Sequence, residues 1–405
     1  MKKNPLFTGS LLVIAGSMAV NAVNYLYHLV MGRMLGPENY GILSSLFSLL
    51  YIVTIIPISS GFAIVKFVSQ APIDQKPSVY NGINRFIIRL GAVLTPLLLI
   101  LSWPLATYLH LPNVFPIFMV PLVFFLSIIT LVNQSTLQSL LNFWGLVGPN
   151  LVSSIAKFGL GVIAVALGWS VSGAMGAVVV SVFLAFLLSV YLLPTAYRHP
   201  SSSQFLLRPF LEYALPVLLQ SLAFTSLFTV DILLVKHYFD PTVAGWYAAL
   251  SLLGKIVYFA AQPVSAVMFP LVTQKISSGK KYLPIFWMSF TLTAMISLVV
   301  LGVYFLFPTL SINLLFGPEY LGIQPELIWM GLFMLLYNLD YFLVSFFLAI
   351  NTIQIVFLPI MAAIAQVLAI TLWHNNLHQV ILASTIIMGA LLAFLLSSLW
   401  SVKKN

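Results

Sequence analysis

The chain has no cysteine, and only 6% of its 405 residues are charged. The absence of cysteine excludes disulfides, thiolate metal ligands and cysteine nucleophiles. A soluble domain carries roughly 25% charged residues, so this chain cannot cover itself with a surface that water would wet. Because 61% of the residues are hydrophobic and the mean hydropathy is +1.07, the chain is predicted to fold mainly in lipid.

The sequence also lacks the motifs of several enzyme classes. The dipeptide Gly254-Lys255 has no glycine at the required upstream position and no Ser or Thr after it, so it is not a phosphate-binding loop. The metalloprotease pattern H-E-x-x-H and the hydrolase pattern G-x-S-x-G are missing as well. We therefore exclude a fused ATPase, and we expect no enzymatic activity and no cofactor.

Long apolar runs fill most of the sequence. A membrane helix needs about 20 predominantly apolar residues, and twelve runs reach that length. They lie at 9–30, 41–69, 85–108, 114–134, 145–167, 171–193, 213–236, 243–271, 284–308, 326–350, 353–373 and 378–401. The loops between them are too short for a folded domain, which disfavours a membrane-embedded glycan polymerase or transferase.

The 17 basic residues are distributed unevenly along the chain. With the N-terminus in the cytoplasm, the inner segments hold Lys2, Lys3, Lys76, Arg85, Arg89, Arg198, Arg208, Lys275, Lys280, Lys281, Lys403 and Lys404. The outer segments hold Arg33 and Lys236 together with Glu38, Asp240, Glu319 and Glu326. This asymmetry follows the positive-inside rule and predicts that both termini are cytoplasmic. It also explains the net charge of +9 without nucleic-acid binding.

The sequence repeats itself after 204 residues. Residues 37–70 align without a gap on residues 241–274, with eight identical positions. The identical positions are Pro37/Pro241, Gly41/Gly245, Leu46/Leu250, Leu49/Leu253, Ile52/Ile256, Val53/Val257, Val68/Val272 and Gln70/Gln274. In the same register, residues 11–30 match residues 215–234, so the first run reads as a membrane helix rather than as a signal peptide.

The repeat predicts two similar lobes, 1–193 and 213–405, joined by a cytoplasmic linker at 194–212 that contains Ser201–Ser203. Six spans in each half is an even number, so both halves face the same way, as in parallel-repeat transporters. Pro57 and Pro263 interrupt two repeat-related runs. We expect these runs to line a central cavity, although prolines are also simply frequent in membrane helices.

Two segments carry a family resemblance. They are residues 32–43 (GRMLGPENYGIL) and residues 231–238 (DILLVKHY), the latter followed by 244–250 (AGWYAAL) and 254–257 (GKIV). With them the chain resembles the polysaccharide biosynthesis or oligosaccharide flippase family. That family belongs to the superfamily that contains the MATE drug exporters and the lipid II flippase. The resemblance implies an all-α membrane protein with about twelve helices in two six-helix lobes around a central cavity.

The resemblance also implies a function. A member of this family moves an undecaprenyl-diphosphate-linked oligosaccharide across the cytoplasmic membrane by alternating access of the two lobes, for assembly of cell-surface polysaccharide. The partners implied are this polyprenyl-diphosphate-linked glycan, membrane lipids, and Na⁺ or H⁺, and a monomer suffices. The alternative is a MATE-like, ion-coupled exporter of small organic cations, whose site should be acidic.

Three ionisable residues fall deep inside predicted helices. Lys157 and Lys255 each lie about twelve residues into their runs, roughly 18 Å from a helix end, and Asp340 is similarly deep. A charge at the bilayer centre costs on the order of 3 kcal/mol, so each is a candidate functional residue. One hypothesis is that both lysines face a central cleft and bind the diphosphate. The other is that each pairs with a carboxylate of its own lobe, for instance Lys255 with Asp340.

Asp340 and three further residues have two interpretations each. Asp231 and Asp340 are candidates for a Na⁺ or H⁺ site or for charge pairing, Asp231 with Lys236 or Lys255. Lys66 is a candidate first contact for the phosphates, or a topogenic charge. Arg33 is a candidate contact for the departing diphosphate, or an anchor of its helix.

A metal site is not expected. His374 and His378 are four residues apart but flank a predicted outer loop, and a metal needs a third ligand that the sequence does not offer.

Overall fold

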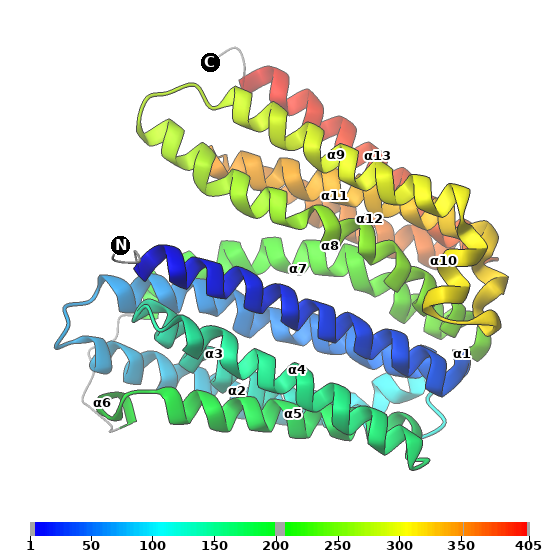
Figure 1. The fold of residues 1–405 in the computed structure, drawn as a ribbon, viewed down its shortest axis with the longest axis horizontal. Helices are drawn as coiled ribbons and strands as arrows, with labels where there is room; N and C mark the ends of the chain where they lie inside the picture. The colour runs from blue at the N-terminus through cyan, green and yellow to red at the C-terminus, as the bar shows by residue number, and fades with distance from the viewer. Residues whose placement is uncertain (1–4, 199–206, 351, 403–405) are drawn as a thin grey trace. The chain divides into compact units, whose positions relative to one another are not determined.

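The computed structural model describes residues 5–198, 207–350 and 352–402. Within these ranges every regular element is a helix, so the predicted all-α class is confirmed (Figure 1). The central part of the predicted linker, 199–206, and the terminal lysines at 2, 3, 403 and 404 lie outside the described residues.

The first half of the chain forms α1 (Pro5–Gln70), α2 (Lys76–Tyr108), η1 (Phe115–Phe118), α3 (Met119–Ser139), α4 (Phe143–Ala166), α5 (Ser170–Leu192) and α6 (Thr195–Arg198). The second half forms α7 (Leu207–Tyr238), α8 (Pro241–Ser277), α9 (Leu283–Leu306), α10 (Pro308–Leu315), η2 (Pro318–Glu326), α11 (Leu327–Ala349), η3 (Ile353–Val356), α12 (Phe357–Leu372) and α13 (Leu377–Val402).

The described residues contain eleven helices that are long and apolar enough to cross a membrane, and the first of these holds two crossings. It covers 59 residues, which at about 1.5 Å per residue is roughly three times the thickness of a bilayer core. Gly36 interrupts it with φ 70° and ψ 172°, a conformation that glycine adopts without a steric penalty. Figure 1 shows α1 turning back at this point. Two crossings in α1 and ten more helices give the predicted twelve spans.

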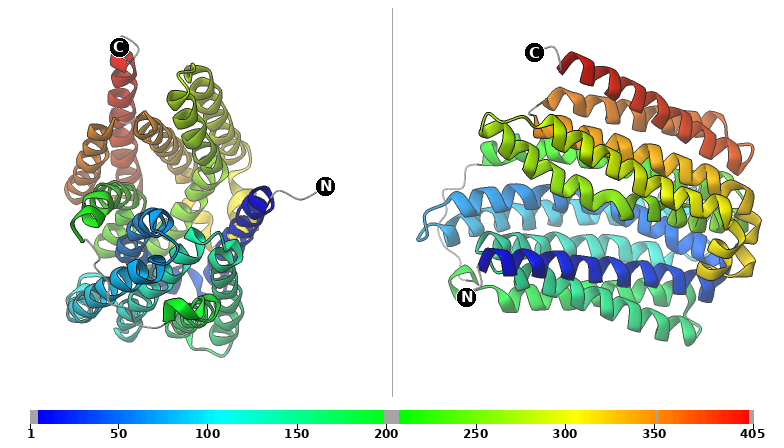
Figure 2. Two further views of the ribbon diagram at one scale, coloured as in Figure 1. Left: turned by 90° about the vertical axis from the view of Figure 1, so that its left-hand side faces the viewer. Right: turned by 45° about the horizontal axis from the view of Figure 1, so that its top comes forward.

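The chain divides into two compact units, 1–221 and 222–405. The boundary lies inside α7, because the first turns of this helix pack on the first unit: Phe210 and Ala214 join a core that contains Ile83, Ile87 and Phe124. The sequence-based division at 193 and 213 stays a prediction. Figure 2 shows the helices of each unit from two further directions.

A buried asparagine connects three helices in each unit. In the first unit, Asn133 of α3 accepts a hydrogen bond from the Tyr80 hydroxyl of α2 at 2.8 Å and donates one to Ser189 Oγ of α5 at 3.0 Å. In the second unit, Asn338 of α11 donates to Ser297 Oγ of α9 at 2.9 Å and to the Val257 carbonyl of α8 at 3.4 Å. Because an unpaired amide in an apolar interior is costly, these bonds fix the register of the helices around α3 and α11.

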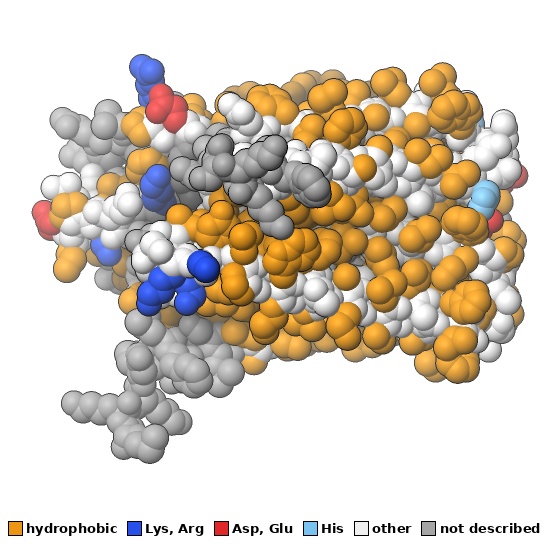
Figure 3. Space-filling model, turned by 90° about the horizontal axis from the view of Figure 1, so that it is seen from above, with side chains coloured by type: hydrophobic (Ala, Val, Ile, Leu, Met, Phe, Trp, Pro, Cys, Tyr) orange, Lys and Arg blue, Asp and Glu red, His pale blue; other side chains and the backbone are white. Residues whose placement is uncertain are grey.

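Local signals start the two helices that carry the mid-membrane lysines. The Asn142 side chain accepts a hydrogen bond from the Gly145 amide at 2.9 Å and so caps α4. Helix α8 begins at Pro241, whose fixed φ and missing N–H suit a first helical position. Figure 3 shows that hydrophobic side chains cover most of the visible face, with lysine and arginine gathered toward one end.

Candidate functional site

Lys157 lies in α4 against two aromatic rings of α1. Its side chain is half-buried, and its Nζ is 4.7 Å from the ring centroid of Tyr27 and 5.4 Å from that of Phe47. The two rings lie on opposite sides of the Gly36 turn. A cation over an aromatic face is attracted by about 0.5–2 kcal/mol, so the two parts of α1 together form a seat for the Lys157 ammonium.

The ring of Tyr27 is held in place by α4 and α5. Its hydroxyl donates a hydrogen bond to the Ala174 carbonyl at 3.2 Å, and its side chain is fully buried. Gly161 lies against the same ring, since a Cβ at that position would be 2.8 Å from Tyr27 Cε2. The position of the Tyr27 ring therefore depends on Gly161. At Gly159, two residues earlier, an added Cβ would have nothing within 4 Å.

The seat of Lys157 contains no carboxylate. The first unit has only three acidic residues, Glu38, Asp74 and Glu212. In the described part of the chain none of them forms an ion pair with Lys157. Within the described residues of the first unit, this ammonium thus contacts the ring faces of Tyr27 and Phe47, which do not neutralise its positive charge.

Lys255 of α8 has a different environment. It is 6% exposed, and its Nζ is 4.2 Å from the ring centroid of Phe228 in α7. Asp231, one turn further along α7, is close enough for its charge to interact with that of Lys255. Lys255 is therefore partly neutralised inside its own unit.

Asp231 is also held by its own hydrogen bonds. The Tyr247 hydroxyl donates to Asp231 Oδ2 at 2.7 Å, and the Ile232 amide donates to Oδ1 at 2.9 Å. The carboxylate is fully buried. Of the two carboxylates weighed as partners of Lys255, the structure places Asp231 beside it.

The repeat relates the two lysine sites through α1 and α7. Residues 11–30 and 215–234 share one register, and in that register Tyr27 corresponds to Asp231. Each therefore occupies the same position in the first helix of its half. The Tyr27 ring lies beside the Lys157 ammonium, and the charge of Asp231 interacts with that of Lys255. The sequence analysis did not predict Tyr27 or Phe47 as site residues. The repeat register could have indicated Tyr27, because it corresponds to Asp231.

Asp340 of α11 is fully buried, and in the described part of the chain neither of its carboxylate oxygens has a hydrogen-bond partner. Its neighbours one turn earlier show where it lies. The Tyr337 hydroxyl donates to the Phe224 carbonyl of α7, and Leu336 approaches Gly389 of α13. Because residues three and four apart share a helix face, Asp340 lies on the face of α11 turned toward α7 and α13.

Lys66 and Arg33 lie near the ends of the two parts of α1. Arg33 is exposed and precedes the Gly36 turn, while Lys66 is exposed near the end of α1, with its Nζ 6.0 Å from the Phe67 ring centroid. The structure does not bring these two residues together.

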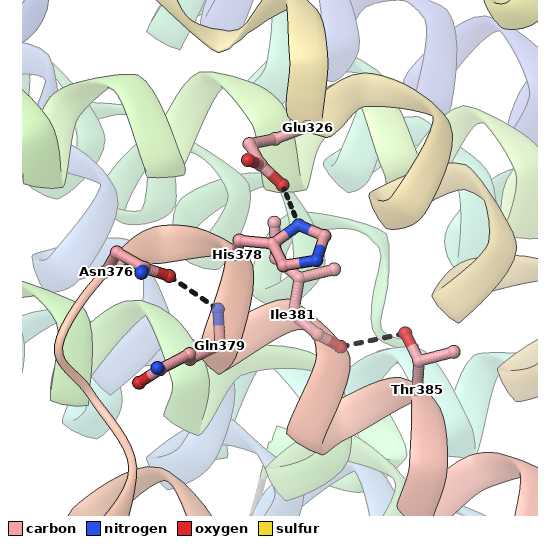
Figure 4. Close-up of polar contacts among 6 residues, drawn as sticks. All are labelled: Glu326, Asn376, His378, Gln379, Ile381 and Thr385. Atoms are coloured by element: carbon pink, nitrogen blue, oxygen red, sulfur yellow. Dashed lines mark hydrogen bonds and ion pairs between the residues drawn. The ribbon is translucent and has the colours of Figure 1, made fainter.

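The two histidines considered for a metal have separate partners. His374 stacks on Tyr238 with 3.8 Å between ring centroids, whereas His378 Nδ1 lies 2.9 Å from Glu326 Oε2. Figure 4 shows the second pair, with His378 at the start of α13 and Glu326 at the end of η2. Among the described residues no group of three His, Cys, Asp or Glu side chains could hold a metal ion.

Two helical units whose helices are long and apolar enough to cross a membrane, with charged residues in the middle of these helices, are typical of a multi-pass membrane protein built like a transporter. A family model described as "Polysaccharide biosynthesis protein" matches residues 30–325. This range is well over half of the chain, so the chain belongs to the polysaccharide biosynthesis protein family. Among curated proteins, no relative matches the chain.

Three solved structures share the fold. A multidrug resistance MATE family transporter of the MOP superfamily, in an inward-facing conformation, has a TM-score of 0.76 and 16% identity over 94% of this chain and 96% of its own. The lipid II flippase MurJ, in an inward closed conformation, has a TM-score of 0.75 and 14% identity over 95% of this chain and 87% of its own. A MOP superfamily transporter from Pyrococcus furiosus has a TM-score of 0.62 and 16% identity over 99% and 96%. At these identities the likeness establishes the fold, and the chain has the fold of a membrane transporter or flippase.

Proposed function

We propose that this protein is a flippase that moves a polyprenyl-diphosphate-linked oligosaccharide across the cytoplasmic membrane for assembly of cell-surface polysaccharide. Membership of the polysaccharide biosynthesis family supports a glycan cargo, and the fold supports transport by alternating access of two lobes. No bond is made or broken in such a step. Both termini lie in the cytoplasm in this proposal, as the distribution of lysine and arginine predicts.

The observation that carries the proposal is the uncompensated charge of Lys157. An ammonium on two ring faces, with no carboxylate of its unit paired with it, keeps its capacity for strong, charge-assisted hydrogen bonds to an arriving anion. A diphosphate group fits this demand, since a lysine binds phosphate as a point charge without a fixed geometry.

Lys255 has a secondary role in this proposal. Asp231 already offsets part of its charge, so Lys255 adds less to diphosphate binding than Lys157 does. Lys66 and Arg33, both exposed, contact the phosphates before and after the central step.

Asp231 and Asp340 are the residues proposed for ion coupling. Asp340 is buried with two oxygens that lack partners in the described part of the chain, and a proton or Na⁺ would relieve the cost of that charge. Asp231 is better satisfied, by Tyr247 and by Lys255. Coupling through Asp340 therefore fits the structure better than coupling through Asp231.

The experiment measures flipping of a fluorescent, undecaprenyl-diphosphate-linked glycan in liposomes that contain the full chain. Lys157→Ala should reduce flipping at least tenfold, and Lys255→Ala should reduce it by less. Lys280→Ala is the matched control, because Lys280 is exposed outside the spans. Flipping at the wild-type rate by a folded Lys157→Ala variant would remove the diphosphate from the proposal.

The second candidate is a MATE-like exporter of small organic cations. The buried carboxylate of Asp340, which has no hydrogen-bond partner among the described residues, favours it, since a cation needs an acidic site. Efflux of tetraphenylphosphonium from the same liposomes decides between the two. The flippase proposal predicts no efflux above that of protein-free liposomes, and efflux that is lost in Asp340→Asn would support the exporter.

A further inference from the structure

Six aromatic side chains of the second unit gather beside Lys255. They are Phe224 and Phe228 of α7, Tyr258 and Phe259 of α8, and Tyr337 and Tyr341 of α11. We call them the six-ring cluster. Phe228 lies 5.6 Å from Tyr258, 5.7 Å from Tyr337 and 6.3 Å from Phe259 between ring centroids.

The six-ring cluster is open on one side. Phe259 is 44% exposed, and Phe228, Tyr258 and Tyr341 are half-buried. The cluster thus offers ring faces that this unit leaves partly uncovered.

The cluster also combines ring faces with polar groups. The hydroxyls of Tyr258 and Tyr341 are hydrogen-bonded to each other, and the ammonium of Lys255 lies over Phe228. A second aromatic cluster in the same unit, Phe286, Phe290, Phe342 and Phe346, also contacts Tyr282 and Trp287. In the six-ring cluster the polar groups include a lysine ammonium over the face of one ring.

The fold itself does not require these rings. The repeat register of 204 residues places Asn24, Thr54 and Ile55 in the first half where the second half has Phe228, Tyr258 and Phe259. The first unit folds with an amide, a hydroxyl and an aliphatic side chain at the same positions. The shared scaffold therefore does not need rings at these three positions.

We propose that the six-ring cluster binds the pyranose ring nearest to the diphosphate of the lipid-linked glycan. The C–H face of a pyranose is apolar and flat enough to stack on an aromatic ring, while its hydroxyls need donors and acceptors at the ring's edge. Phe228, Phe259 and Tyr258 supply the faces, and the phenols of Tyr258 and Tyr341 supply the polar edge. The inference rests on the proposed function and names where the sugar binds.

The same cluster is a poor seat for an organic cation. A ligand cation would compete for the face of Phe228, which the Lys255 ammonium occupies at 4.2 Å, and it would be repelled by that ammonium. A neutral sugar meets no such repulsion.

The test compares the affinity of the purified full chain for bare undecaprenyl diphosphate with its affinity for the same carrier bearing one glucosyl, galactosyl or N-acetylglucosaminyl residue. We expect the wild type to bind at least one glycosylated carrier about tenfold more tightly, a gain typical of one or two aromatic contacts. Phe259→Leu and Tyr258→Leu should remove most of this gain and leave the affinity for the bare carrier unchanged. Phe290→Leu, a half-buried ring of the second cluster, is the matched control.

Several outcomes would overturn the inference. These are equal affinity of the wild type for bare and glycosylated carriers, an equal loss of both in Phe259→Leu, or a cluster-dependent binding of tetraphenylphosphonium without a gain from sugar. Phe259 is exposed, so its variant should fold even where Tyr258→Leu does not.

A second readout separates this inference from the proposed function. Saturation-transfer NMR with methyl pyranosides, which carry no diphosphate, should show transfer from the wild-type protein to the pyranosides and a loss of this transfer in Phe259→Leu. Failure of all carriers to bind, with this transfer retained, would reject the diphosphate and keep the sugar site. Carrier binding without any transfer to the pyranosides and without a gain from sugar would reject the sugar site and keep the diphosphate.

Discussion

The two units of this protein each hold one lysine at membrane depth, and they stabilise it in different ways. Lys157 of the first unit faces the rings of Tyr27 and Phe47. Lys255 of the second unit faces one ring and the charge of Asp231. Ring faces reduce the cost of a buried cation without neutralising it, whereas a carboxylate does neutralise it. In the proposed function, Lys157 therefore binds an anion from outside the unit, whereas the charge of Lys255 is partly offset by Asp231 of its own unit.

The largest loss of thermal stability should come from removing the Asp231 carboxylate. Asp231→Leu removes the charge that interacts with Lys255 and the acceptor of the Tyr247 hydroxyl, and a buried polar group left without its partner costs about 1–3 kcal/mol, more where a charge is involved. Thermal unfolding of the purified chain should show a clear drop in stability. The double variant Asp231→Leu/Lys255→Met should recover most of it, and a double variant as unstable as the single one would contradict the pairing.

Gly161→Ala should displace the Tyr27 ring and so weaken its contact with the Lys157 ammonium. A Cβ there would lie 2.8 Å from Tyr27 Cε2, and displacing a packed ring costs about 1–3 kcal/mol. We expect lower thermal stability and a weaker affinity for undecaprenyl diphosphate. Gly159→Ala is the control, since nothing lies within 4 Å of a Cβ at Gly159. Equal effects of the two substitutions would argue against the role of Tyr27.

One substitution can give the first unit the carboxylate of the second. Tyr27 corresponds to Asp231 in the repeat register, so the new carboxylate of Tyr27→Asp should neutralise Lys157. The affinity for undecaprenyl diphosphate should fall about tenfold, which corresponds to 1.4 kcal/mol. Tyr27→Asn, similar in size but neutral, should retain more of that affinity, and an equal loss in both variants would show that only the ring matters.

The smallest effect should come from the pair outside the lysine sites. His378 and Glu326 form a contact of 2.9 Å with side chains that are 40% and 20% exposed. Partly exposed pairs contribute about 0–1 kcal/mol. Glu326→Gln should therefore change thermal stability far less than Asp231→Leu and leave flipping at the wild-type rate. A loss of thermal stability comparable with that of Asp231→Leu would contradict the expectation that buried charges contribute more than exposed ones.

The number of spans could be predicted from the sequence because each depends on local composition. Twelve apolar runs stand out, and Gly36-Pro37 marks the turn that splits α1, since proline disfavours a helical residue before it and glycine allows a positive φ. The repeat could also be read directly, and it gave the correspondence of Tyr27 and Asp231.

The partners of the lysines could not be predicted in the same way. Lys157 and Lys255 stand out as deep charges, yet which side chains meet them depends on the rotation of α1, α4, α7 and α8 about their axes. In a chain with 14% aromatic residues, Tyr27 and Phe47 have no local signal that separates them from core rings. Asp231 and Asp340 were equally plausible partners of Lys255 until the packing of α7 against α8 placed Asp231 there.

The most direct test of the account measures the affinity of the full chain for undecaprenyl diphosphate in the wild type, Lys157→Met and Lys255→Met. A hydrogen bond to a charged group contributes about 1.5–3 kcal/mol, so Lys157→Met should bind at least about tenfold more weakly. Lys255→Met should change the affinity by less, because Asp231 already offsets that charge. Wild-type affinity in folded Lys157→Met, or a larger loss in Lys255→Met, would contradict the account.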